Sequence, residues 1–149
     1  MLPQPSQRHD GRPPQIKKIQ IALWVQATFA LCGGNLVALT LYGVQSASVE
    51  ELREAGFAER PPTGPFWILV VLLFLTCAFA AMAAGRLSSQ LPIARKWAIA
   101  ASVIYFAVGS TLVMFAPNMV LVLAIPLVAC MFSLFWLFSA DVKEWFTPK

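Results

Sequence analysis

The most reactive side chains in this sequence are three cysteines and one histidine. Cys32, Cys77 and Cys130 stand in three different apolar stretches, no CxxC pair occurs, and His9 lies in a proline-rich segment before the first stretch. Zinc and haem sites need several such ligands together, and dithiol chemistry needs a reactive cysteine pair. We therefore expect no catalytic residue, no cofactor and no metal, and we interpret the cysteines as small apolar residues.

The apolar stretches also contain no Asp, Glu, Lys, Arg or His. Proton-coupled pumps and the four-helix multidrug exporters depend on ionisable groups of this kind within their spans. A nucleotide site would need a glycine-rich loop, whereas Gly33 and Gly34 lie inside an apolar stretch. The sequence therefore predicts a protein that is not an enzyme.

Uncharged polar side chains remain as candidates for contacts between helices. Thr28, Cys32 and Asn35 recur at i, i+4 and i+7, which places them on one face of a helix. Gly34 belongs to a neighbouring face of small residues, where helices can approach closely. We predict that Asn35 points into the bundle or into an interface with a partner protein or a second copy. Within the chain, the candidate hydrogen-bond partners of Asn35 are a backbone carbonyl freed by Pro126 and the side chains of Ser102, Tyr105, Ser110 and Thr111.

The elements that carry these residues follow from composition and from the placement of charge. Apolar residues make up 58% of the chain and charged residues 12%, against about 45–50% and 25% in soluble proteins. Four stretches carry no charge, and each reaches the roughly 20 residues that a helix needs to cross a membrane. We predict an all-α, integral membrane four-helix bundle of antiparallel spans. The spans are 19–43, 66–85, 97–116 and 119–140, within a domain covering residues 19–146.

The placement of the basic residues predicts the orientation of the spans. Nine of the 11 Lys and Arg residues lie in the N-terminal segment, the second loop and the C-terminal tail, which share one side of a four-span protein. Arg53 and Arg60, in the first loop, are the other two. Because basic residues beside spans are retained in the cytoplasm, we expect a plasma membrane protein with both termini cytoplasmic.

The segments outside the spans differ in expected order. Residues 1–18 are rich in proline and polar residues and are predicted to be disordered. The first loop contains Ser48 and Glu51 at capping-box spacing, followed by Gly56 in a position to end a helix. We therefore expect a short extracytoplasmic helix from Val49 to Ala55. Pro117 and Asn118 are expected to form a tight turn between the last two spans.

Aromatic residues stand where spans meet the membrane surface. Trp67 and Trp97 begin the second and third spans, and Trp145 and Phe146 follow the fourth. Aromatic rings favour the headgroup level of a bilayer. We expect all four to be interfacial anchors, with the last pair on a helix that continues along the membrane surface.

Two short motifs resemble a known group of proteins. Residues 94–98 read Ala-Arg-Lys-Trp-Ala, residues 144–146 read Glu-Trp-Phe, and the first loop contains Ser-Val-Glu-Glu-Leu-Arg. Together they resemble small four-pass membrane proteins of actinobacteria, which often read Gly-Arg-x-Trp-Ala-Arg at the third span and end in Trp-Phe. Arg95, Trp97 and Ala98 match that pattern, whereas Ala94 and Ile99 depart from it. The resemblance implies a four-span layout and an actinobacterial source.

Two functions remain open on these grounds. The first is a non-enzymatic membrane protein that acts by association, as an accessory or scaffold subunit. The second is a small oligomeric transporter or channel for an uncharged or lipophilic substrate, with Thr28, Asn35 and Tyr105 as its polar lining. The expected partners are the lipid bilayer and another membrane protein or a second copy. The basic residues lie beside spans, so they do not indicate nucleic acid.

Overall fold

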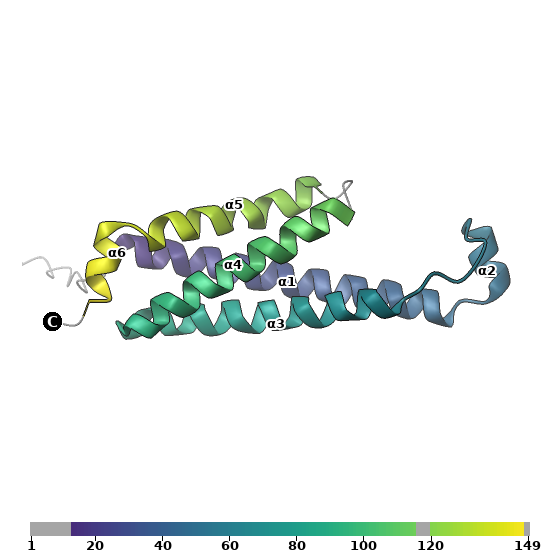
Figure 1. Ribbon diagram of the computed structural model, residues 1–149, viewed down its shortest axis with the longest axis horizontal. Helices are drawn as coiled ribbons and strands as arrows, with labels where there is room; N and C mark the ends of the chain where they lie inside the picture. The colour runs from purple at the N-terminus through teal and green to yellow at the C-terminus, as the bar shows by residue number, and fades with distance from the viewer. Residues whose placement is uncertain (1–12, 116–119, 148–149) are drawn as a thin grey trace, which may run out of the picture.

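Four long helices dominate the computed structural model, which describes residues 13–115 and 120–147 (Figure 1). They are α1 (Pro14–Ser46), α3 (Gly64–Arg86), α4 (Pro92–Phe115) and α5 (Val120–Leu137). Three short helices are α2 (Val49–Glu54), the 3₁₀ helix η1 (Leu87–Ser89) and α6 (Ala140–Trp145). All four long helices are long and apolar enough to cross a membrane, and the described ranges contain no strand. The chain is an all-α, multi-pass membrane protein, as predicted.

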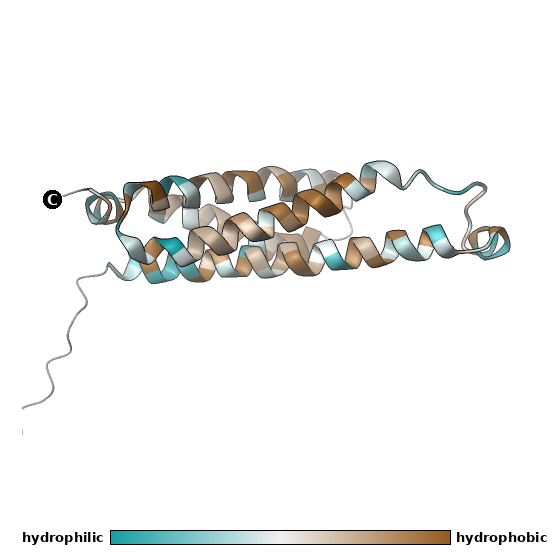
Figure 2. Cartoon of the chain, turned by 90° about the horizontal axis from the view of Figure 1, so that it is seen from below, coloured by the Kyte–Doolittle hydropathy of each residue, from teal (hydrophilic) through white to brown (hydrophobic). Residues whose placement is uncertain are grey.

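The long helices form a bundle in which chain neighbours run antiparallel (Figure 1). α1 packs against α3 and α5, and α4 packs against the same two helices, so α1 and α4 lie diagonally opposite. Hydrophilic residues gather toward the two ends of the bundle, and hydrophobic residues cover much of the middle (Figure 2). Many large apolar side chains face outward from this middle region. This is the surface that a hydrocarbon solvent requires.

The tightest packing lies at the end of the bundle that carries α6. Ile16, Ile19 and Leu23 of α1 are fully buried there. The helices opposite them contribute mainly alanine, with fully buried residues at Ala83, Ala84, Ala94, Ala98 and Ala101. Small residues on α3 and α4 allow their backbones to approach, so the large α1 side chains fill the space between them.

Helix α1 begins earlier than the sequence predicted. Its first residue is Pro14, so residues 14–18 are helical and the expectation that disorder extends to Lys18 is wrong. Proline suits the first turn of a helix because it has no N–H to leave unpaired. Burial of Ile16 and Ile19 then holds this turn against the bundle. Residues 1–12 lie outside the described part of the chain.

The remaining long helices also differ from the predicted spans at their ends. α4 starts at Pro92 rather than Trp97, because Gln90 takes a left-handed conformation that closes η1 and turns the chain. α5 ends at Leu137, and Ser139 has an extended backbone before α6. α6 therefore turns across the end of the bundle instead of prolonging α5 (Figure 1). The turn at residues 117–118 lies outside the described residues.

The loop helix α2 confirms the predicted capping pattern. Ser48 accepts a hydrogen bond from the Glu51 N–H, and the Glu51 carboxylate accepts one from the Ser48 N–H at 2.6 Å. At the other end Gly56 has φ of +88°, and the Phe57 N–H donates to the Leu52 carbonyl at 2.9 Å. These bonds satisfy groups that a helix of this length otherwise leaves unpaired.

Helices α1 and α3 project beyond the other two. Gln26 on α1 lies beside Ser133 on α5, and the two helices run antiparallel. Leu39 is as many residues beyond Gln26 as Val120, the first residue of α5, is before Ser133. Leu39 and Val120 therefore lie at the same level of the bundle. The last two turns of α1 and the first turns of α3 therefore extend about 10 Å past the α4–α5 hairpin (Figure 1).

Candidate functional site

The outward face of α1 holds three of the four predicted contact residues. Thr28, Cys32 and Asn35 are all exposed on the outside of the bundle. The Asn35 side-chain amide donates to the Leu31 carbonyl of its own helix at 2.8 Å. The predicted intrachain contact of Asn35 is therefore wrong. The prediction failed because α1 is rotated about its axis so that the neighbouring small residues, not Asn35, occupy its inward face.

A seven-residue repeat runs along this outward face. Ile21, Thr28, Asn35 and Tyr42 are seven residues apart, and each is exposed. A second series begins halfway between them and consists of exposed Trp24, exposed Leu31 and half-buried Ala38. Alternating spacings of three and four define the seam of a left-handed helix pair. We call these seven residues the α1 seam.

Gly34 lies on a neighbouring face of α1 and does contact another span. It is buried, and a Cβ added there would lie 3.4 Å from the Leu73 Cβ and 3.5 Å from the Phe74 ring. The small side chain therefore sets the approach of α1 to α3. Cys130 is buried and its thiol contacts the Ser102 carbonyl at 2.9 Å, whereas Cys77 is half-buried.

A buried polar cluster joins α1, α4 and α5 at mid-bundle. The Gln26 amide donates to the Ser133 hydroxyl at 3.3 Å, and the hydroxyls of Ser133 and Ser102 lie 2.9 Å apart. All three residues are fully buried. The Gln26 Oε1 atom has no hydrogen-bond partner among the described residues. This cluster was not predicted, although a Gln within an uncharged span could have signalled it.

Of the predicted anchors, Trp67 and Trp97 lie at the ends of the bundle. Both are half-buried, at the start of α3 and near the start of α4 respectively. Trp97 stacks on Phe79 with ring centroids 5.3 Å apart, and the Arg86 guanidinium lies 5.8 Å from the Trp97 ring. Each position suits the headgroup region, where an aromatic ring and a cation are both stable.

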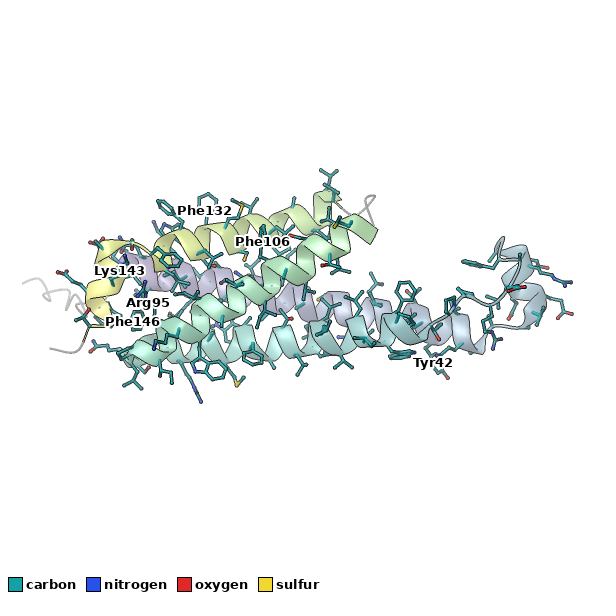
Figure 3. All side chains as sticks on the ribbon, viewed as in Figure 1. Tyr42, Arg95, Phe106, Phe132, Lys143 and Phe146 are labelled. Carbon is teal, nitrogen blue, oxygen red and sulfur yellow. The ribbon has the colours of Figure 1, made fainter. Side chains whose placement is uncertain are left out.

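The second predicted pair of anchors behaves differently. Trp145 is half-buried and its indole N–H has no partner among the described residues. Phe146 is only 4% exposed and packs in the core cluster with Ile16 and Val142, close to Arg95 in Figure 3. The expectation that Phe146 contacts headgroups needs correction. Because α6 folds back across the bundle, Phe146 closes its end instead.

An apolar pocket of about 410 Å³ lies where α1 and α3 project past the α4–α5 hairpin. α1 contributes one wall from Gly33 to Val44, and Phe66 of α3 lies on the other. Leu112 and Leu123 belong to α4 and α5, and Pro61 and Pro62 come from the loop. The volume falls within the range of roughly 300–1,000 Å³ typical of small-molecule sites.

Nothing in the described ranges assembles a metal centre, since no three His, Cys, Asp or Glu side chains are grouped there. No protein-family model, curated protein or solved structure matches the chain. The resemblance to small four-pass actinobacterial proteins thus stays a prediction that rests on Arg95, Trp97 and Ala98.

Proposed function

We propose that this membrane protein acts by association, as a non-enzymatic accessory or scaffold subunit that assembles through the α1 seam. The observation that carries the proposal is the outward position of Asn35. A primary amide without partners in hydrocarbon costs roughly 2–7 kcal/mol, and its own helix offers Asn35 only the Leu31 carbonyl. A transmembrane helix packed on the seam would supply the missing hydrogen bonds.

A second copy of the chain fits this seam well. Copies in one membrane share an orientation, so a two-fold axis would place the two α1 helices parallel and Asn35 opposite Asn35. An amide group has both donors and an acceptor, which makes the pair self-complementary. A single Asn on a largely apolar seam also fixes the register of paired helices.

The proposal places the protein in the plasma membrane with both termini cytoplasmic. The start of α1 and the helix α6 lie at the same end of the bundle (Figure 1). Lys17, Lys18, Arg86, Arg95 and Lys143 belong to the helices that meet at this end. The excess of basic residues there supports a cytoplasmic location.

The transporter alternative receives less support from the geometry. Its predicted polar lining was Thr28, Asn35 and Tyr105. The first two face outward, and Tyr105 is buried against Ala30 and Cys130. The single chain therefore does not bring these three side chains to one surface.

Cysteine crosslinking in native membranes tests the association. Leu31→Cys, made in a chain carrying Cys32→Ala and Cys77→Ala, places one thiol on the seam while keeping Asn35. Phe132→Cys in the same background is the matched control, because Phe132 is exposed on α5 away from α1 (Figure 3). Oxidation should yield a disulfide-linked dimer from position 31 only. Crosslinking from position 132 alone, or from neither position, would contradict the proposal.

A further inference from the structure

The apolar pocket at the α2 end of the bundle extends along α1 over a length that matches one leaflet. It runs along α1 from Gly33 to Val44, and Tyr42 and Trp67 mark the level of the membrane surface. Nine residues separate Gly33 from Tyr42, or about 14 Å of helix. This length is close to half the thickness of a bilayer's hydrocarbon core, which is about 30 Å in total.

The lining of the pocket excludes most polar ligands. Its side chains are aliphatic, aromatic or proline, except for Thr40 and Thr63. The Thr40 hydroxyl donates to the Leu36 carbonyl, and the Thr63 hydroxyl accepts from the Gln45 amide at 2.9 Å. Both hydroxyls thus already have partners. A ligand would meet only weak dispersion contacts, which favours a flexible hydrocarbon chain.

Charged groups stand at the mouth of the pocket. Arg60 directly precedes the lining residues Pro61 and Pro62, and its guanidinium donates to the Ala47 carbonyl at 2.7 Å. This bond holds the cation close to the end of α1 and leaves further N–H donors free. Glu59 is its exposed neighbour in the chain. A cation and an anion at consecutive positions of the chain complement a phosphate linked to an ammonium group.

We propose that this pocket binds one acyl chain of a zwitterionic phospholipid from the leaflet on the α2 side, with the lipid phosphate at Arg60. Lipid tails are as apolar as leucine, so the hydrophobic effect alone does not distinguish the pocket from the rest of the lipid-facing surface. The walls of α1 and α3, the closed end at Leu112 and Leu123, and the Glu59–Arg60 pair supply the selectivity. This site is independent of the α1 seam.

Photolabelling of the full chain in lipid nanodiscs tests this proposal. Phosphatidylethanolamine carrying a diazirine in one acyl chain should label α1 and α3 within the pocket, as mapped by mass spectrometry of the peptides. The same probe with a phosphatidylglycerol headgroup should not concentrate there. Equal labelling by the two probes, or labelling spread evenly to the outward face of α4 around Phe106, would overturn the proposal in favour of bulk surrounding lipid.

Variants make the result specific to the pocket. Gly33→Phe should eliminate the pocket label, because an added Cβ at Gly33 meets no atom within 4 Å and the new ring would fill the space. Gly43→Phe is the matched control, since Gly43 is equally free of neighbours on the same helix but does not line the pocket. Glu59→Gln, outside the spans, should remove the preference for phosphatidylethanolamine over phosphatidylglycerol, because both lipids offer Arg60 a phosphate and only the ammonium group is matched by the Glu59 carboxylate. Retention of the label in Gly33→Phe, or of the preference in Glu59→Gln, would contradict the assignment.

Discussion

At the residue scale, two amides in α1 have opposite surroundings. Gln26 lies inside the bundle and is fully buried, whereas Asn35 lies outside it. Nine residues correspond to two and a half turns, so the two side chains point in opposite directions. Their interactions are therefore different: Gln26 joins α1 to α5, and Asn35 remains available for another chain.

The Gln26 cluster makes a prediction about stability. Ser133→Ala should lower the free energy of unfolding by about 1 kcal/mol, because it leaves the buried Gln26 amide without its acceptor. Gln26→Leu should be close to neutral, since it also removes the unpaired Oε1 atom. Unfolding in detergent, followed by circular dichroism, measures both variants. A larger loss for Gln26→Leu than for Ser133→Ala would contradict this account.

The sequence predicted which of these residues share a face of α1, but not whether that face points into or out of the bundle. The i, i+4, i+7 spacing correctly placed Thr28, Cys32 and Asn35 on one face, because a helix fixes that relation locally. Which face turns inward depends on packing against other spans. Apolar residues are distributed around all sides of α1, so hydrophobicity gave no indication of its rotation.

At the element scale, Gly34 controls the contact between α1 and α3. Gly34→Val should destabilise the bundle by about 1–3 kcal/mol, since added methyl groups would overlap the Leu73 and Phe74 side chains. Gly43→Val is the control, because nothing lies within 4 Å of its added Cβ. Thermal unfolding of the two purified variants in one detergent compares them. Equal midpoints would show that α1 and α3 do not approach as described.

The loop helix α2 should respond to acid. Hydrogen bonds from the Ser48 backbone N–H and then its side chain lower the pKa of the Glu51 carboxyl below its ordinary value of 4.5. A lowered pKa in the folded helix means that the stabilisation is present above the ordinary value. It is lost as the pH falls through the lowered pKa.

Amide hydrogen exchange of the Ser48–Glu54 segment measures this effect. Protection should be constant at neutral pH and should fall in acid, below the ordinary carboxyl range. Glu51→Gln should retain protection without the acid response, because a glutamine can complete the same capping box but does not titrate. An unchanged acid response in Glu51→Gln would assign the effect to another group.

Both ends of α2 were predictable because capping depends on residues that are close in the sequence. Ser48, Glu51 and Gly56 act within one segment, and the structure places all three as expected. The starts of α1 and α4 were less predictable. Their first turns contain basic residues, which suggested loops, but burial of Ile16 and Ala94 extends each helix beyond the uncharged stretch.

At the scale of the whole molecule, the charge distribution predicts the topology. A reporter fused after Lys149 should read cytoplasmic, and one inserted near Thr63 should read external, because nine of 11 basic residues lie on the side of the termini. Paired alkaline phosphatase and fluorescent protein fusions report the two compartments. A cytoplasmic signal near Thr63 would reverse the proposed orientation.

The four-span layout itself was predictable because it depends only on length and the absence of charge. The end of the bundle where α1 and α3 project beyond α4 and α5 was not predictable. On the α1 side it arises because α1 is longer than α5, and because Gln26 and Ser133 set the register of these two helices. Such an arrangement depends on contacts between residues that are far apart in the chain.

The most direct test of assembly through α1 is the dimerisation equilibrium of Asn35→Leu in liposomes. Stepwise dilution of fluorescently labelled protein in lipid, with single-molecule photobleaching, measures the dissociation constant. Loss of one interhelical amide contact should weaken the dimer by about 1 kcal/mol, or about fivefold. Thr111→Leu is the control, since Thr111 is an outward polar residue of α4 whose hydroxyl donates to the Ala107 carbonyl of its own helix. We predict weakening in Asn35→Leu alone; equal constants for wild type, Asn35→Leu and Thr111→Leu would contradict the account.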